Sequence, residues 1–464
     1  MCSMSSGDFV ADRVAGADES YALAERLFGW TAPIQYMWIF PADPGADVVA
    51  TLVDALAAGS FDRKVKAASV PLAHDRWVRA RRPAPLRIEP GTIDDAAVGD
   101  WMDERLRAVD LDPRAGRGFT VECAHTTSGR FVMALLVSHM IADGQAVYAA
   151  LDAARTGRAR SLLPDAEDVS GWRGVRDDVR DVGAQVPAVL TSLAVIGRAA
   201  VRAGASALRQ SLLDRSAATE VTVPTSSPTT EPTVCPRDSE TTLAVVDLDR
   251  AQWARRAADL GGTPNSLFTA ILGGLLRSTG YPMGPEGTRI CIAVSNRTDG
   301  DERANASGGV WIRVPGPIGP ERGLGEIRAS SKAAFAANAA ADDSVQRHLQ
   351  PVARLLPDRV LGTMMTSVPG PDTTVSNLGS APQSALELGD QVAESFAIRA
   401  IMQGRDAAER RQQGPAIAAW AVEYGDKVTV TVFGIHPDYA GDTDTVRALV
   451  SAELTRWSLD HSFW

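Results

Sequence analysis

The sequence has few cysteines, and they are far apart. Only four occur in 464 residues, and no two form a Cys-x-x-Cys pair. This scarcity excludes a cysteine zinc site and a disulfide scaffold, and it predicts a reducing, cytoplasmic setting. The four are Cys2, Cys123, Cys235 and Cys291.

Long apolar runs are also missing. The longest uncharged, largely apolar run lies between Asp181 and Arg198, and Gln185 and Pro187 interrupt it. It is shorter than the roughly 20 residues that a membrane-spanning helix needs. The first 20 residues contain no basic region followed by an apolar stretch, so no signal peptide is expected. Peripheral contact with a membrane surface stays open.

Basic charge and cofactor motifs are scarce as well. The net charge of −10 argues against nucleic-acid binding, because phosphate contacts need a basic surface. Only four of the 47 basic residues are lysines. No cluster of His, Asp or Glu has the spacing of metal ligands, and neither a phosphate-binding loop nor a dinucleotide fingerprint occurs. We therefore expect no metal and no bound cofactor.

The length and composition predict two domains of roughly 200 residues each. Residues 216–240 contain four prolines and many Ser and Thr residues, which is typical of a linker or crossover. The sequence therefore divides into an N-terminal lobe at 1–215, this linker, and a C-terminal lobe at 241–464. Each half mixes helical and strand patterns, which predicts two α+β lobes.

Apolar periodicity and capping residues predict the elements of both lobes. Helices are expected at 21–28, 46–58, 146–154, 172–212, 249–260, 265–277 and 443–457. Strands are expected at 34–40, 119–125, 131–137, 241–246, 289–294, 309–314, 416–422 and 428–434.

The most informative segment joins a buried strand to a helix. The apolar run Phe131–Val137 is followed by Ser138-His139-Met140-Ile141-Ala142-Asp143-Gly144. An uncharged aliphatic run of this length indicates a strand buried on both faces. His139 therefore leaves the core at a strand end, where an imidazole can act as a general base near neutral pH. The alternative is a structural histidine beside a helix start.

The pattern His-x-x-x-Asp-Gly resembles the signature of the HxxxD acyltransferase superfamily, which includes condensation domains, wax ester synthase/diacylglycerol acyltransferases and polyketide-associated acyltransferases. Further segments are similar to this family in the expected order. They are 265–280, Ile292–Arg297 with Gly308–Pro315, Val375–Gly379, and Glu423–Lys427 continuing to Gly434. Together these segments extend over roughly residues 20–460.

The resemblance implies two lobes of the chloramphenicol acetyltransferase type, each a mixed sheet with flanking helices, in a V-shaped pseudo-dimer with a tunnel between them. It implies that His139 is the general base and that no acyl-enzyme forms. Asp143 would pair with Arg297 from the second lobe and act structurally, because a buried pair fixes loop geometry. Gly144 would permit a tight turn and close backbone approach.

Ser138 stands where condensation domains usually carry a first histidine, so the chain departs from a standard peptide-bond-forming domain. Ser138 could still contact substrate. Ser376 and Asn377 could donate hydrogen bonds to an oxyanion, or they could cap a turn, as Ser and Asn often do. Both interpretations stay open.

The function expected from the resemblance is transfer of an acyl group from a thioester to an alcohol or amine. The thioester, coenzyme A or a phosphopantetheine carrier protein, would be a co-substrate. The alternatives are a free-standing condensation enzyme that uses carrier-bound substrates and a non-catalytic condensation-like domain that recruits partners. An enzyme that uses carrier-bound substrates would bind an acyl or peptidyl carrier protein.

The segment Arg155–Arg209 holds nine arginines among apolar positions. It could dock an acidic carrier protein, the diphosphate of coenzyme A, or anionic lipid. Nearby aspartates favour a solvated helix face with internal ion pairs instead. They are Asp165, Asp168, Asp177, Asp178 and Asp181.

Overall fold

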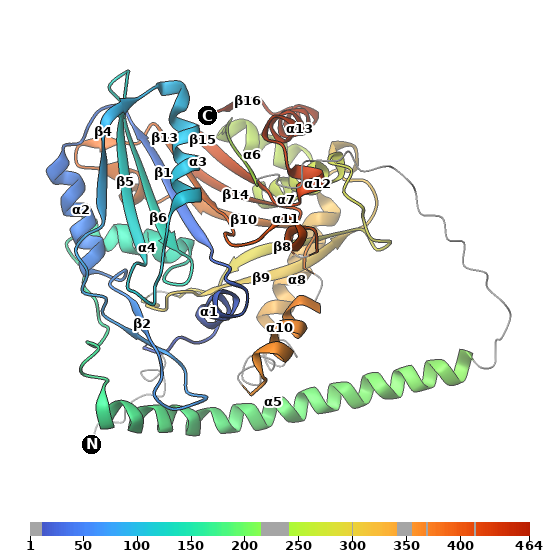
Figure 1. The fold of residues 1–464 in the computed structure, drawn as a ribbon. Helices are drawn as coiled ribbons and strands as arrows, with labels where there is room; N and C mark the ends of the chain where they lie inside the picture. The colour runs from blue at the N-terminus through green and yellow to red at the C-terminus, as the bar shows by residue number, and fades with distance from the viewer. Residues whose placement is uncertain (1–11, 215–240, 299, 341–354, 368–369, 413) are drawn as a thin grey trace.

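The computed structural model describes residues 12–214, 241–298, 300–340, 355–367, 370–412 and 414–464. Two mixed β-sheets stand beside each other, and helices cover them (Figure 1). The expected fold class, two α+β lobes that each carry a mixed sheet with flanking helices, is confirmed.

The first sheet has the strand order β13-β1-β6-β5-β4, and only the β4–β5 pair is parallel. Its strands are β1 (Pro33–Phe40), β4 (Leu86–Ile93), β5 (Phe119–Thr126), β6 (Phe131–Ser138) and β13 (Ser395–Ala400). Both β1 and β6 are buried along their whole length, as the uncharged run at 131–137 predicts.

Helices cover both faces of this sheet because alternate side chains point to opposite sides. On β1, Tyr36 and Trp38 lie in the same core as α2 (Ala46–Ala58) and α4 (Gly144–Arg155). Met37 and Ile39 instead lie with residues of α3, which is Val98–Ala108.

The second sheet has the order β16-β7-β15-β14-β10-β8-β9, with parallel pairs at β14–β10 and β10–β8. Its strands are β7 (Thr242–Asp249), β8 (Thr288–Ser295), β9 (Ser307–Val314), β10 (Thr373–Ser380), β14 (Ile417–Tyr424), β15 (Lys427–Gly434) and β16 (His461–Phe463). Its core is shared with α6 (Arg250–Asp259), α7 (Pro264–Ser278), α8 (Gly325–Ala340) and α13 (Thr443–Arg456).

The lobes share a strand. β13 comes from the second half of the chain, yet it pairs with β1, with Trp38 opposite Phe396. The Thr431 hydroxyl of β15 donates a hydrogen bond to the carbonyl of Ile398, 2.7 Å away, and so ties the second sheet to β13. The proposed division at 216–240 lies outside the described residues and stays a prediction.

The remaining elements are short, except for the helix α5 at Gly171–Asp214. They are α1 (Ala17–Phe28), α5 (Gly171–Asp214), α10 (Asp358–Ser367), α11 (Ala407–Gln412), α12 (Pro437–Ala440), the ribbons β2 (Lys64–Lys66) with β3 (Arg76–Val78) and β11 (Glu387–Leu388) with β12 (Gln391–Val392), and the 3₁₀ turns η1 (Asp95–Ala97), η2 (Pro320–Arg322) and η3 (Gln383–Ala385). Within the described ranges, no helix combines the length and apolar character needed to cross a membrane.

Candidate active site

His139 follows the last residue of β6 and sits in a turn that hydrogen bonds hold. Its own N–H donates to the carbonyl of Ala32, 2.9 Å away, beside the start of β1. The N–H of Ile141 donates to the carbonyl of Ser138, also at 2.9 Å, and closes the turn. The buried strand therefore delivers the imidazole to a fixed position at the edge of the first lobe.

The amide of Asn305 fixes the protonation of the His139 ring. Its Oδ1 lies 3.0 Å from Nδ1 of His139. Its Nδ2 lies 3.0 Å from Oδ1 of Asp18, 2.8 Å from the carbonyl of His139 and 3.2 Å from that of Met140. All three of these partners are acceptors, so the NH₂ group must face them and Oδ1 must face the ring.

Because Oδ1 of Asn305 can only accept, Nδ1 of His139 carries the proton in the neutral ring. Nε2 is then the unprotonated nitrogen. Within the described part of the chain, Nε2 makes no hydrogen bond. Among the described residues, Nε2 is therefore the ring nitrogen that no protein group engages.

Two residues of α1 complete the surroundings of the ring. Asp18 accepts hydrogen bonds from the Asn305 backbone N–H at 2.9 Å and from the Trp77 indole N–H at 3.1 Å, so it holds Asn305 in place. Tyr21 stacks on the imidazole, with ring centroids 4.4 Å apart and an angle of 22° between the planes. The ring is therefore fixed by hydrogen bonds at its edge and by a stacked ring on its face.

Burial lowers the pKa of His139 below its usual value of 6.5, while the charge of Asp143 and the contact with Asn305 oppose that shift. Burial raises the pKa of Asp18, and hydrogen bonds from Asn305 and Trp77 oppose the shift. Burial therefore favours the neutral form of the imidazole, which is the form that a general base requires.

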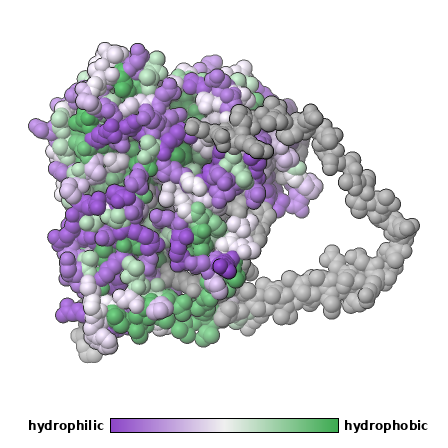
Figure 2. Space-filling view, in the orientation of Figure 1, coloured by the Kyte–Doolittle hydropathy of each residue, from purple (hydrophilic) through white to green (hydrophobic). Residues whose placement is uncertain are grey.

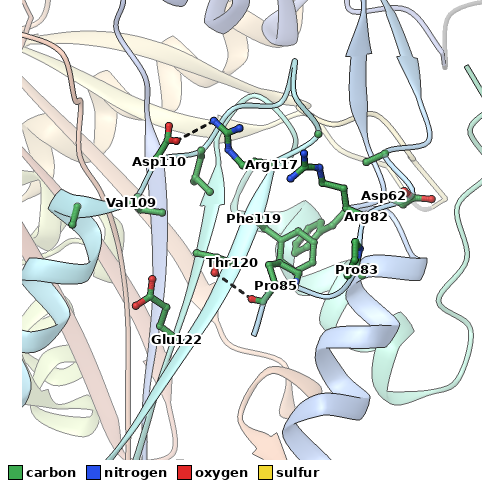
Figure 3. A pocket seen from close by; sticks show the side chains of 16 residues that line it. Asp62, Arg82, Pro83, Pro85, Val109, Asp110, Arg117, Phe119, Thr120 and Glu122 are labelled. Carbon is green, nitrogen blue, oxygen red and sulfur yellow. Dashed lines mark hydrogen bonds and ion pairs between the residues drawn. The ribbon is translucent and has the colours of Figure 1, made fainter. Parts of the chain in front are cut away.

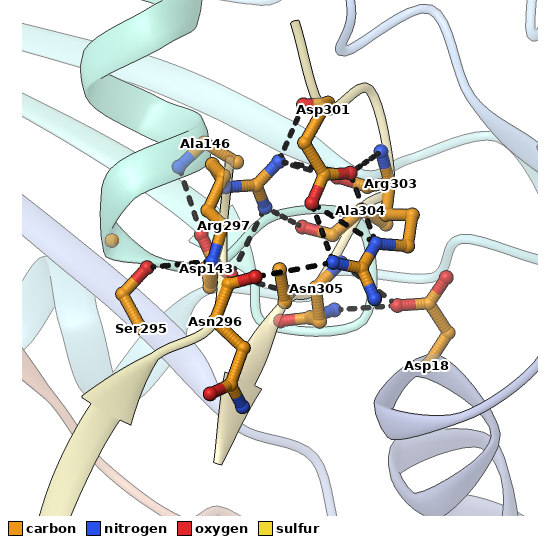
Figure 4. Close-up of polar contacts among 12 residues, drawn as sticks. Asp18, Asp143, Ala146, Ser295, Asn296, Arg297, Asp301, Arg303, Ala304 and Asn305 are labelled. Carbon is orange, nitrogen blue, oxygen red and sulfur yellow. Dashed lines mark hydrogen bonds and ion pairs between the residues drawn. The ribbon is translucent and has the colours of Figure 1, made fainter. Parts of the chain in front are cut away.

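Asp143 does not contact the imidazole of His139 through a hydrogen bond; it caps α4 and pairs with the second lobe (Figure 4). Its Oδ1 accepts from the N–H of Ala146 at 2.8 Å, and its Oδ2 accepts from the N–H of Ala306 at 2.7 Å. The guanidinium of Arg297 lies 3.0 Å from Oδ2, and both side chains are almost fully buried. These contacts tie the start of α4 to the loop before β9.

Arg297 also organises the loop between β8 and β9. Its guanidinium donates to the carbonyls of Asp301, Arg303 and Ala304 at 2.8, 3.0 and 3.2 Å. The loop therefore wraps around one cation (Figure 4). Its next residue, Asn305, contacts His139. The ion pair positions the residue that sets the tautomer.

Gly144 permits close approach of the second lobe. A Cβ at this position would lie 2.6 Å from Cδ2 of Leu378, at the end of β10, and 3.4 Å from the Tyr36 hydroxyl oxygen. The carbonyl of Gly144 accepts a 2.7 Å hydrogen bond from the same hydroxyl. The space taken by Leu378 and Tyr36, rather than a left-handed backbone, accounts for glycine here.

The other predicted site residues are Ser138, which precedes His139, and Ser376 and Asn377 on β10. The hydroxyl of Ser138 accepts from the N–H of Met140 at 3.3 Å, and the side chain is buried in the turn. Oδ1 of Asn377 accepts from the N–H of Gly379 at 2.9 Å, the turn-capping contact. Ser376, half-buried on β10, makes no side-chain hydrogen bond within the described residues.

Two cavities lie close to the His139 turn. One, of about 340 Å³, opens at the start of β5 and is lined by Phe119, Thr120 and an Arg117–Asp110 ion pair (Figure 3). Phe119 is paired with Val137, two residues before His139. The other, of about 440 Å³, borders the turn itself at Ile141 and Ala142.

The larger cavity is lined by both apolar and charged residues. Its lining includes seven alanines, five arginines and the acidic residues Asp12, Asp301 and Glu302. These arginines are Arg63, Arg158, Arg160, Arg297 and Arg303. His139 lines neither cavity, so each is a space beside the turn rather than around the imidazole.

Three residues around the His139 ring were not predicted from the sequence: Asn305, Asp18 and Tyr21. Asn305 lies in a polar loop whose residues carry no motif, and α1 precedes His139 by more than 100 residues. The only signal for Asn305 was its place in the loop that follows Arg297.

No family model matches the sequence, and no curated protein matches it. Solved structures do match. The condensation domain of the monacolin K polyketide synthase aligns with a TM-score of 0.54 at 15% identity, over 96% of this chain and 96% of that one. The fold is that of the condensation domains.

Two further structures extend this likeness. The wax ester synthase/diacylglycerol acyltransferase from Marinobacter aquaeolei aligns with a TM-score of 0.53 at 13% identity, over 96% of this chain and 98% of that one. The first condensation domain of the CDA synthetase aligns with a TM-score of 0.53 at 14% identity, over 97% and 96%. The condensation-type fold therefore extends over nearly the whole chain, as the ordered sequence segments predicted.

Proposed function

We propose that this chain is an acyltransferase that moves an acyl group from a thioester to an alcohol or amine, with Nε2 of His139 as the general base. The observation that carries the proposal is the His139–Asn305 contact of 3.0 Å, which leaves Nε2 as the unprotonated nitrogen of the neutral ring. The likeness to condensation domains and to an acyltransferase supports this class of reaction.

The proposed reaction needs no covalent enzyme intermediate. Nε2 of His139 takes the proton from the acceptor hydroxyl or amine while the acceptor oxygen or nitrogen attacks the thioester carbonyl. A tetrahedral oxyanion forms. It then collapses, the carbon–sulfur bond breaks, and the departing thiolate takes the proton from Nε2. The products are an ester or amide and a free thiol, and the imidazole is neutral again.

The oxyanion needs a hydrogen-bond donor in the second lobe. Ser376 is the candidate whose hydroxyl makes no other side-chain hydrogen bond in the described chain. Asn377 could donate only through its Nδ2, because an amide oxygen accepts hydrogen bonds; its Oδ1 accepts one from the N–H of Gly379. One such donor is worth about 2.7–4 kcal/mol in the transition state.

The donor is an acyl thioester of coenzyme A or of a phosphopantetheine carrier protein. The cavity of about 440 Å³ beside the turn is lined by arginines that could contact the phosphate of such a donor and by apolar side chains that could contact an acyl chain, together with Asp12, Asp301 and Glu302. Both donors carry phosphate and a pantetheine thiol, so this chemistry does not choose between them.

The test is acceptor-dependent thiol release from a panel of acyl-coenzyme A and acyl-carrier thioesters, with pooled alcohols and amines and with products identified by mass spectrometry. His139→Ala is expected to lower the rate at least about 100-fold. His461→Ala is the matched control, because His461 is on β16 with both ring nitrogens within 3.0 Å of Leu459 and Ser451 oxygens.

The proposal is supported if thiol release is lost in His139→Ala and kept in His461→Ala. The donor that reacts then shows whether the enzyme uses coenzyme A or a carrier protein. Release only from carrier-bound donors identifies a free-standing condensation enzyme. Equal rates for wild type and His139→Ala would contradict the role of His139. Absence of release with every donor would favour a recruitment domain.

A further inference from the structure

Helix α5 is attached to the body through its charged side. Asp178 lies 2.8 Å from the guanidinium of Arg13 and 3.4 Å from that of Arg76. One turn later, Asp181 lies 3.0 Å from Nδ1 of His74. These contacts fix which side of the helix faces the protein.

The opposite side of α5 carries exposed large apolar residues. Trp172, Val179, Val186 and Leu190 are 81%, 56%, 48% and 62% exposed. Their spacings of seven, seven and four residues place them on one face of an α-helix. Figure 2 shows hydrophobic residues gathered along the lower edge of the view, where Figure 1 places the first part of α5. An ordinary surface helix buries its apolar face; α5 exposes it.

Arginines flank this apolar stripe. Arg173, Arg176 and Arg180 are exposed and follow one another at spacings of three and four, and Asp177 is the acidic residue that pairs with the last two, at 3.8 and 3.3 Å. The sequence from Val182 to Leu213 then contains three arginines and no acidic residue. A net-positive apolar helix on an acidic protein is a local departure from the rest of the chain.

We propose that α5 lies in the interface of an anionic membrane, with the stripe of Trp172, Val179, Val186 and Leu190 in the lipid and the arginines at the headgroups. Interfacial helices combine an apolar face, a basic flank and a tryptophan at the boundary. The helix lies on the membrane and does not cross it.

The charge and shape of the stripe favour lipid over a protein partner. Two copies packed stripe to stripe would bring the exposed Arg173, Arg176 and Arg180 of both copies into the contact. Asp177 is the acidic residue beside them, because Asp178 and Asp181 already pair with the body of the protein. Gly183 and Pro187 interrupt the large side chains that a second helix would need for packing. A fluid lipid surface tolerates both interruptions.

The test is flotation of the full chain with vesicles of phosphatidylcholine, with and without phosphatidylglycerol. Binding to the anionic vesicles is expected, with weakening as salt rises. The double substitution Val179→Asp and Leu190→Asp should lower binding at least about tenfold. Val392→Asp is the control, because Val392 is 56% exposed on the separate ribbon β12.

Circular dichroism and thermal unfolding establish that each variant is folded; the substituted residues are exposed, so little change is expected. Failure of wild type to bind anionic vesicles would overturn the proposal, as would equal binding by the double variant. A dimer in sedimentation that the double variant abolishes, without vesicle binding, would assign the stripe to a second copy. Thiol release in detergent-free buffer tests the proposed function separately.

Discussion

Nδ1 of His139 lies 3.0 Å from Oδ1 of Asn305, a residue 166 positions later in the chain and on a loop of the second lobe. The predicted base is therefore complete only when the two lobes are together. The first lobe supplies the ring on a buried strand, and the second supplies the acceptor that determines its tautomer. Asp18 of α1 holds that acceptor from the other side.

Replacing Asn305 by leucine should impair the base without removing it. With no acceptor at Nδ1, the ring can place its proton on Nε2, and kcat should fall about 10–100-fold with a smaller change in KM. Asn305→Asp keeps an acceptor and adds a negative charge, so the pKa of His139 should rise. Steady-state kinetics over a pH series measures both effects. A leucine variant with wild-type kcat would contradict the tautomer assignment.

The pH dependence of wild type follows from the same environment. Burial lowers the pKa of His139 below 6.5. The base is neutral above its pKa, so activity should be full at about pH 7 and be lost as pH falls below about 6.5. Asn305→Asp should move this acid limb to higher pH. An acid limb of wild type centred above about pH 6.5 would contradict the burial argument.

Breaking the Asp143–Arg297 pair should destabilise the fold. Arg297→Ala leaves a buried carboxylate without its cation, and the free energy of unfolding should drop by about 3–5 kcal/mol. Denaturant unfolding provides the measurement. The matched control is Arg313→Ala, which removes a 2.6 Å pair with Glu286 whose side chains are 57% and 70% exposed. The control should change stability by at most about 1 kcal/mol. Equal losses in the two variants would contradict a structural role for the buried pair.

Gly144→Ala should strain the contact between α4 and β10. The new methyl group would lie 2.6 Å from Cδ2 of Leu378, so the variant should lose about 1–3 kcal/mol of stability. In a Leu378→Ala background, Gly144→Ala should cause little further loss of stability, and a double-mutant cycle measures this difference. Gly99→Ala in α3 is the control, because a Cβ there meets nothing within 4 Å. Strict additivity of the two substitutions would contradict the packing account.

Much of this architecture could be predicted from the sequence because local patterns determine it. The buried run before His139 forms β6, and Asp143 caps α4 as its place before Gly144 suggests. Helix α7 begins at Pro264, next to the predicted start at residue 265, and Thr263 and Ser266 form its capping box. These elements depend on residues a few positions apart.

The remaining features depend on contacts between distant segments. β13 joins the first sheet although it lies after the second lobe has begun, and no turn signal indicates such a crossover. Asn305 and Tyr21 reach His139 from a loop and a helix whose sequences carry no motif. Only the folded chain brings them together. The sequence of 155–209 showed arginines among apolar positions, but it did not indicate that large apolar residues of α5 face outward.

Nitrogen-15 NMR of histidine-labelled protein tests most directly whether Nε2 of His139 is an unprotonated base. The spectrum of His139→Ala assigns the resonances by difference. At about pH 7 we expect Nε2 in the unprotonated range and Nδ1 in the protonated range, with the two interchanged or averaged in Asn305→Leu. A proton on Nε2, or a charged ring at this pH, would contradict the proposed chemistry.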